Sequence, residues 1–148
     1  MRILVSACLL GLPVRYDGLS KPCERVVSLR ENHILIPICP EQLGGLPTPR
    51  PRAEISNGRV VNEFGEDVTE NFKKGAMITL KIAEVTGVEL AILKSKSPSC
   101  GIGLVYDGSF SGRLVEGNGM TAELLIENGY RVVDENSEIV EKLRGERT

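Results

Sequence analysis

Cysteine is the residue type in this chain that most directly suggests chemistry, and three of the four cysteines share one kind of position. Cys8, Cys39 and Cys100 each lie at or just beyond the end of a short apolar run, among glycine, proline and serine rather than leucine and valine. The fourth, Cys23, lies at the start of a predicted helix, where a cysteine commonly packs as a small apolar side chain. This shared pattern predicts that the first three thiols act together.

The apolar runs at residues 2–7, 33–38 and 88–93 have the length and composition of buried β-strands. Parallel strands end at one edge of a sheet, about 5 Å from neighbour to neighbour. Open α/β sheets bind their ligands at that edge. We therefore expect the loops after these strands to bring the three cysteines to one site.

Three converging thiolates suit a metal centre better than a redox pair, because the chain has no C-x-x-C motif. Zinc takes four ligands in a structural site, and three plus water in a catalytic one. An iron–sulfur cluster held by three cysteines leaves one iron free to bind substrate as a Lewis acid. The residues alone leave the cluster and zinc as equal alternatives.

Polar residues near these cysteines are candidates for proton transfer and substrate binding. Glu41, shortly after Cys39, is the natural acid or base at such a site. Ser99, directly before Cys100, can supply a hydroxyl there or hydrogen-bond its own turn. Arginines suit anions and carbonyl groups, and the charged residues expected to line the crevice and bind substrate are Arg15, Asp17, Arg50 and Arg52.

Strands and helices alternate along the chain. Helices are predicted over residues 22–31, with Pro22 first, from a capping box at Asp67 to Gly87, over 120–128, and after Ser137. A fourth strand is predicted at 130–133, hairpins around Asn57-Gly58 and Asp107-Gly108, and an extended proline-rich segment within 40–52. This order predicts one α/β domain, residues 1–148, with a three-layer Rossmann-like fold and a mainly parallel sheet of about four strands.

Composition narrows the classes of function. The net charge of −2 and the aromatic content of 4% give no sign of a nucleic-acid partner. No apolar run approaches the ~18 residues of a membrane span, and too few apolar residues precede Cys8 for a secretory signal. We therefore expect a cytoplasmic protein with a small-molecule substrate, whose cysteines bind metal or react rather than form disulfides.

Several segments of the chain together resemble one known family. They are V-S-A-C-L-L-G and V-R-Y-D-G near the N-terminus, C-P-E-Q-L-G-G-L-P-T-P-R-P and G-E-D-V-T in the middle, and L-K-S-K-S-P-S-C-G further on. In this order they resemble the domain-of-unknown-function family 523, whose characterised members are thiouracil desulfidases. The resemblance covers nearly the whole chain, and its motifs are long and specific.

The resemblance implies a 4Fe-4S cluster bound by Cys8, Cys39 and Cys100, with one iron left open to take up the sulfur of a thiolated base such as 2-thiouracil. It implies an enzyme that removes this sulfur by hydrolysis without net electron transfer. Glu41 then handles protons, and Ser99 assists at the substrate. Two alternatives remain: a non-catalytic carrier of a metal, a cluster or sulfur, and a protein whose three cysteines hold a structural zinc ion.

Overall fold

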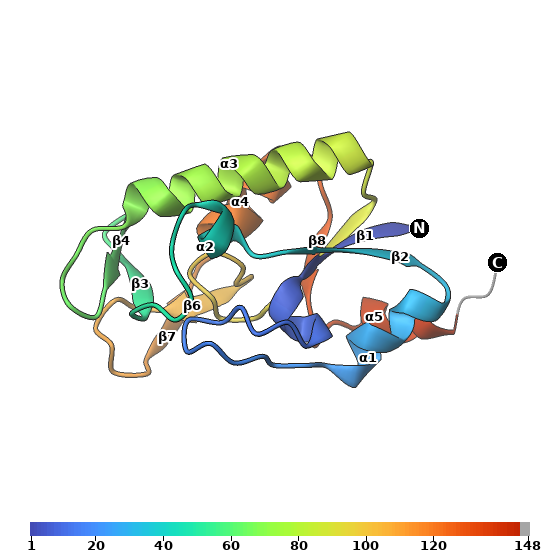
Figure 1. Cartoon of the computed structure of the whole chain (residues 1–148), viewed down its shortest axis with the longest axis horizontal. Coiled ribbons are helices and arrows are strands. Elements are labelled where there is room, and N and C mark those ends of the chain that lie inside the picture. Colours follow the sequence, from blue (N-terminus) through green and yellow to red (C-terminus); the bar gives the residue numbers. More distant parts are fainter. Residues whose placement is uncertain (146–148) are drawn as a thin grey trace.

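The chain folds around one parallel β-sheet, which the computed structural model in Figure 1 shows between two layers of helices. The structure describes residues 1–145. The strands lie in the order β2-β1-β5-β8, and each neighbouring pair is parallel. Their bounds are Arg2–Ser6 (β1), Ile34–Ile38 (β2), Leu90–Leu93 (β5) and Val132–Asp134 (β8). The predicted α/β fold with a mainly parallel sheet is confirmed.

The two central strands carry apolar side chains on both faces, which is why helices must cover the sheet on both sides. In β1, Ile3 and Val5 belong to one core cluster and Leu4 to the other. In β5, Ile92 and Leu93 divide between the same two clusters. All five side chains are completely buried.

The helices form the outer layers of this arrangement. On one face lie α1 (Glu24–Val27), the 3-10 helix η2 (Ser28–Glu31) and α5 (Glu138–Arg144), while α3 (Thr69–Thr86) and α4 (Met120–Glu127) lie on the other (Figure 1). Ser137 caps α5 as predicted, because its side chain accepts a hydrogen bond from the N–H of Ile139. No helix within residues 1–145 is long and apolar enough to cross a membrane.

Two antiparallel hairpins extend beyond the main sheet. The first joins β3 (Ala53–Ser56) to β4 (Arg59–Asn62), and the second joins β6 (Leu104–Tyr106) to β7 (Leu114–Glu116). The predicted turn at Asn57 and Gly58 is confirmed, since both residues have the positive φ angles, 51° and 76°, that a type I′ turn needs. β3 also contacts β6, so the two hairpins lie against each other.

Two predicted helix starts differ from the structure. The helix predicted from Pro22 begins later, with Cys23 at its N-cap, and continues as η2. Asp67 does not form the predicted capping box, because Val68 occupies the N-cap and the Asp67 carboxylate accepts the N–H of Thr69 instead. The short helix α2 (Pro40–Leu43), whose first position suits proline, was not predicted, and it precedes the later part of residues 40–52 that was predicted to be extended.

Two glycines allow α2 to rest directly on the backbone of α3. A Cβ atom on Gly75 of α3 would lie 1.9 Å from the carbonyl oxygen of Pro40, and one on Gly44 would lie 2.0 Å from that of Asn71. The side-chain amide of Asn71 also donates to the Gly44 carbonyl at 2.9 Å. The place of α2, which carries Glu41, is therefore set by backbone contact with the longest helix in residues 1–145.

Candidate functional site

Three strand-end loops bring the predicted cysteines to one cavity. Cys8 lies in the 3-10 helix η1 (Ala7–Leu10) directly after β1, Cys39 lies between β2 and α2, and Cys100 lies in the loop after β5. Because β2, β1 and β5 are neighbours in the sheet, their carboxyl ends share one edge. All three cysteines line a cavity of about 460 Å³ at this edge, whereas Cys23 packs against a core cluster.

The thiols are protonated at neutral pH in the absence of a metal. Burial raises the pKa of Cys8 to about 11 and that of Cys100 to about 12, and it also raises the pKa of Cys39. The Lys94 ammonium opposes this effect at Cys8 without overcoming it. Metal binding at this site must therefore displace thiol protons, as is general for thiolate ligands.

The arrangement of the thiols bears on which metal centre they fit. A single zinc ion needs each thiolate about 2.3 Å from one point. Among residues 1–145, no group of three or more His, Cys, Asp and Glu side chains is placed to hold a metal ion in this way. Cys8, Cys39 and Cys100 all line one cavity, and cysteine thiolates are the ligands of iron–sulfur clusters. This set of donors therefore fits such a cluster.

The two predicted catalytic residues are hydrogen-bonded to each other beside the cysteines. Glu41 lies in the first turn of α2, and its Oε2 accepts a hydrogen bond from the Ser99 hydroxyl at 3.1 Å. The other oxygen, Oε1, accepts from Nε of Arg50 at 2.9 Å. The Ser99 hydroxyl also lies 3.6 Å from the Cys100 sulfur. The cavity therefore holds a carboxylate bonded to a hydroxyl, and this hydroxyl lies beside the sulfur of Cys100.

A second serine determines which way the Ser99 hydroxyl points. Oγ of Ser97 accepts the backbone N–H groups of Ser99 and Cys100, each at 3.1 Å. These two bonds occupy both acceptor sites of the Ser97 hydroxyl, so its proton is left to donate to Oγ of Ser99, 3.0 Å away. Ser99 then donates onward to Glu41, which gives a chain of hydroxyls directed at the carboxylate.

Arg50 is buried behind Glu41, with a side chain only 4% exposed. A guanidinium has five N–H donors, and five acceptors of this protein surround this one. They are Glu41 Oε1 and Thr48 Oγ1 at 2.9 Å, the carbonyls of Pro47 at 3.2 Å and Val14 at 2.9 Å, and the Cys39 sulfur at 4.0 Å. Arg50 was predicted to bind substrate, but this geometry leaves it no spare donor and favours a role in positioning Glu41 and Cys39.

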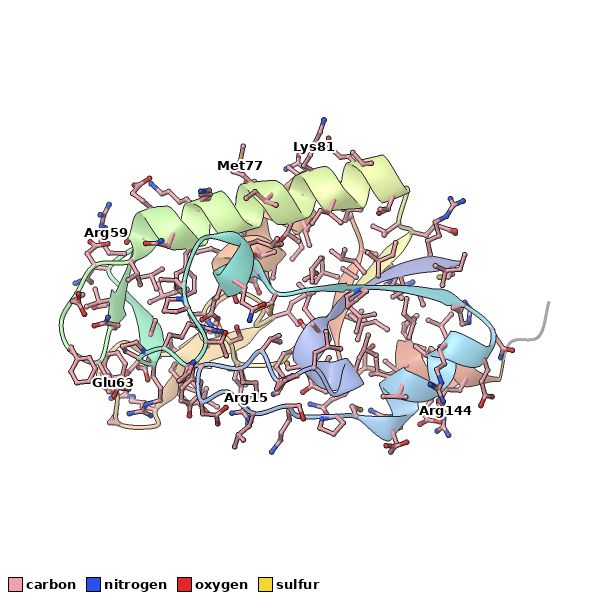
Figure 2. All side chains as sticks on the ribbon, in the orientation of Figure 1. Arg15, Arg59, Glu63, Met77, Lys81 and Arg144 are labelled. Carbon is pink, nitrogen blue, oxygen red and sulfur yellow. The ribbon has the colours of Figure 1, made fainter. Side chains whose placement is uncertain are left out.

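The other predicted substrate-binding residues lie at the rim. Arg15 lines the cavity from the loop after η1, which lies on the far side of the molecule from α3 (Figure 2). Asp17 does not line the cavity, and it instead lies 3.9 Å from the Arg15 guanidinium. Arg52 lines the cavity with an exposed side chain, which pairs with Glu63 at 3.2 Å and lies over the ring of Phe110.

Four charged residues that line the cavity were not predicted, namely Lys21, Lys96, Lys94 and Glu54, and the last two bear on its chemistry. Lys94 follows β5 directly, and its ammonium lies 3.1 Å from the carboxylate of Glu135. Its place at a strand end is a signal that could have identified it. Glu54 lines the cavity from the hairpin strand β3, where nothing in the sequence distinguishes it from a surface carboxylate. Both residues are considered further below.

Comparison with known proteins places the chain in a family. The family model described as 2-thiouracil desulfurase matches residues 3–137. The chain therefore belongs to this family, and the relationship predicted from its motifs is confirmed.

Two relatives agree with this assignment. The chain is 44% identical over 144 residues to the uncharacterized protein YbbK of Bacillus subtilis (strain 168), covering 90% of this chain and 95% of that protein. It is also similar to the solved structure of the 4Fe-4S-dependent thiouracil desulfidase TudS, with a TM-score of 0.85 and 43% sequence identity. That match covers 96% of this chain and 94% of the TudS chain, so nearly all of the fold is shared.

Proposed function

We propose that this protein is an iron–sulfur-dependent desulfidase that hydrolyses the thiocarbonyl group of a thiolated pyrimidine such as 2-thiouracil. The observation that carries the proposal is the convergence of Cys8, Cys39 and Cys100 on the cavity that also contains Glu41 and Ser99. The family and the 43% identical thiouracil desulfidase support the same activity. In the overall reaction, water supplies the oxygen of the product carbonyl and sulfur leaves as sulfide, so no electrons are exchanged.

Cys8, Cys39 and Cys100 are the residues that would hold the cluster. When bound, a 4Fe-4S cluster with one iron free of cysteine supplies a soft Lewis acid, which prefers sulfur to oxygen. Burial of Cys8 and Cys100, with Cys39 half-buried, suits this role, because a water-poor site protects such a centre and strengthens its electrostatic interactions.

Glu41 is the base of the proposed reaction. Its Oε1 is held by Arg50 and its Oε2 faces the Ser99 hydroxyl, so the carboxylate has a fixed orientation at the cavity. In the proposed step, Glu41 takes a proton from the attacking water while the new bond to carbon forms. Ser99 carries a proton between Glu41 and the substrate, because its hydroxyl is aligned by Ser97 on one side and by Glu41 on the other.

The rim of the cavity is proposed to position the substrate. Arg15 and Arg52 line it with guanidinium groups that can bind carbonyl or anionic groups. Asp17 acts indirectly, since its carboxylate lies beside Arg15. Lys94 adds a positive charge close to the cysteines, which favours the sulfide that forms there.

Anaerobic reconstitution with iron and sulfide, followed by assay with 2-thiouracil, tests the proposal. We expect about four iron atoms per chain and release of uracil and sulfide. Glu41→Gln should keep its iron and lose turnover by about 10²–10⁴-fold, the usual contribution of a general base. The same substitution at the exposed Glu116 of β7 is the matched control and should leave turnover unchanged.

A cysteine series tests the ligands separately from the chemistry. Cys8→Ser, Cys39→Ser and Cys100→Ser should each lose iron, whereas Cys23→Ser, outside the cavity, should retain it. A protein that loads the cluster but releases no uracil would be a carrier rather than an enzyme. Zinc in place of iron after anaerobic preparation would indicate the structural alternative.

A further inference from the structure

Glu54 is a buried carboxylate in the cavity wall that the proposed chemistry does not use. It lies in β3, is 5% exposed, and lines the same cavity as the three cysteines. Its Oε1 accepts two backbone hydrogen bonds, from Gly108 at 3.0 Å and from Phe110 at 3.1 Å. One oxygen of Glu54 therefore holds the loop between β6 and β7, which closes this side of the cavity.

The second oxygen, Oε2, accepts no hydrogen bond and forms no ion pair within residues 1–145. Among residues 1–145, Thr121 Oγ1 is the one fully buried side-chain oxygen or nitrogen without a hydrogen-bond partner. Oε2 of Glu54 also has no partner, so it cannot be fully buried and must be partly exposed. Glu54 is otherwise buried and lines the cavity, so the cavity is where a ligand could meet Oε2. A fixed carboxylate oxygen without a protein partner is available to a ligand.

We propose that Oε2 of Glu54 accepts a hydrogen bond from a neutral donor group of the substrate, and so determines which thiocarbonyl compounds bind. The inference rests on the proposed desulfidase activity. A thiolated pyrimidine carries ring N–H groups that suit such an acceptor, and a sugar attached to it carries hydroxyls. Glu54 is thus a specificity residue in the cavity wall, and it rejects analogues that lack the donor.

The substitution Glu54→Gln separates recognition of substrate from support of the loop. The amide oxygen of glutamine can still accept from Gly108 and Phe110, and the reverse orientation would set an NH₂ group against two N–H donors. The NH₂ group must then face the cavity in place of Oε2. The loop keeps its anchor, while the acceptor offered to the substrate becomes a donor.

We expect Glu54→Gln to raise the KM for 2-thiouracil by at least about tenfold with little change in kcat, the range for a hydrogen bond to a charged group. Binding of uracil to the reconstituted protein, measured by calorimetry, should weaken by a similar factor. Glu116→Gln, an exposed position in β7, is the matched control and should change neither quantity. Wild-type KM and uracil affinity in Glu54→Gln would overturn the inference.

The wild-type protein offers a second test that does not depend on a variant. If a ring N–H is the donor, 1-methyl- or 3-methyl-2-thiouracil should lose about tenfold in kcat/KM, and Glu54→Gln should abolish that difference. If a hydroxyl is the donor, 2-thiouridine should gain over the free base, and the gain should vanish in Glu54→Gln. Equal kcat/KM values for all these compounds would refute the assignment. Absence of turnover in the wild-type protein refutes the proposed function instead, and uracil binding then decides the role of Glu54.

Discussion

Arg50 either supports the site structurally or binds the substrate. The variant Arg50→Met separates these two roles. Methionine keeps much of the length of the side chain and removes its charge and its donors. The variant leaves Glu41 without the partner of its Oε1, in a pair whose side chains are only 4% and 15% exposed. It also removes the link from the Val14 carbonyl to the loop at Thr48.

The expected loss of stability follows from this burial. Removing one partner of a buried ion pair costs about 3–5 kcal/mol, mainly because the remaining charge is left uncompensated. For a chain of this size, such a loss corresponds to a fall of about 6–20 °C in Tm. Arg59, paired with Asp67 at the surface with a side chain 52% exposed, is the matched control. Arg59→Met should cost no more than about 1 kcal/mol.

Urea denaturation of the full chain, followed by circular dichroism, measures these differences. The double variant Arg50→Met/Glu41→Gln should be more stable than Arg50→Met alone, because neither charge is then left unpaired. If Arg50→Met unfolds with the same free energy as Arg59→Met and raises only KM, Arg50 contacts substrate and the reasoning from its five acceptors is wrong.

Three further predictions concern the supports of the site. Ser97→Ala should lower kcat about tenfold with iron content unchanged, because the Ser99 hydroxyl is no longer oriented, and Ser97→Thr should restore it in steady-state kinetics. Gly75→Ala should lower the free energy of unfolding by about 1–3 kcal/mol, since its Cβ would lie 1.9 Å from the Pro40 carbonyl oxygen. A more stable Gly75→Ala protein, as helix propensity alone predicts, would contradict that contact. Burial would raise the pKa of Glu135, but the N–H of Ser95 and the Lys94 ammonium outweigh it and lower that pKa below its ordinary 4.5. Its contribution to stability is therefore present above pH 4.5 and lost as the pH falls through the native value, and Glu135→Gln should flatten this part of an acid-unfolding curve.

The strands and turns that position the site were largely predictable, because they depend on local sequence patterns. Continuous apolar runs predict strands buried on both faces, and polar residues directly after them must lie at one edge of a parallel sheet. Cys8, Cys39 and Cys100 could be assigned to one place on this ground alone. The Asn57-Gly58 turn was equally local, since only residues that tolerate positive φ form it readily.

The supports of the site could not be predicted in the same way. Arg50 and Arg52 are near neighbours in one proline-rich segment, yet the first is buried against Glu41 and the second is exposed at the rim. No periodic pattern marks which of two arginines turns inward in an irregular loop. The burial of Glu54 was equally unpredictable from the sequence, because it depends on a loop of the other hairpin that donates two N–H groups to its carboxylate.

The amino-acid sequence by itself determined the fold class, the convergence of three cysteines at one sheet edge, and, through its motifs, the family. These depend on strand order and on residues close to strand ends, both of which are encoded locally. Only the tertiary structure decided how the side chains pair within the cavity. It showed that Ser97 directs Ser99 at Glu41, that Arg50 is fully engaged by protein acceptors, and that Glu54 keeps one oxygen open. Such pairings join segments far apart in the chain, and their geometry exists only once the loops have packed.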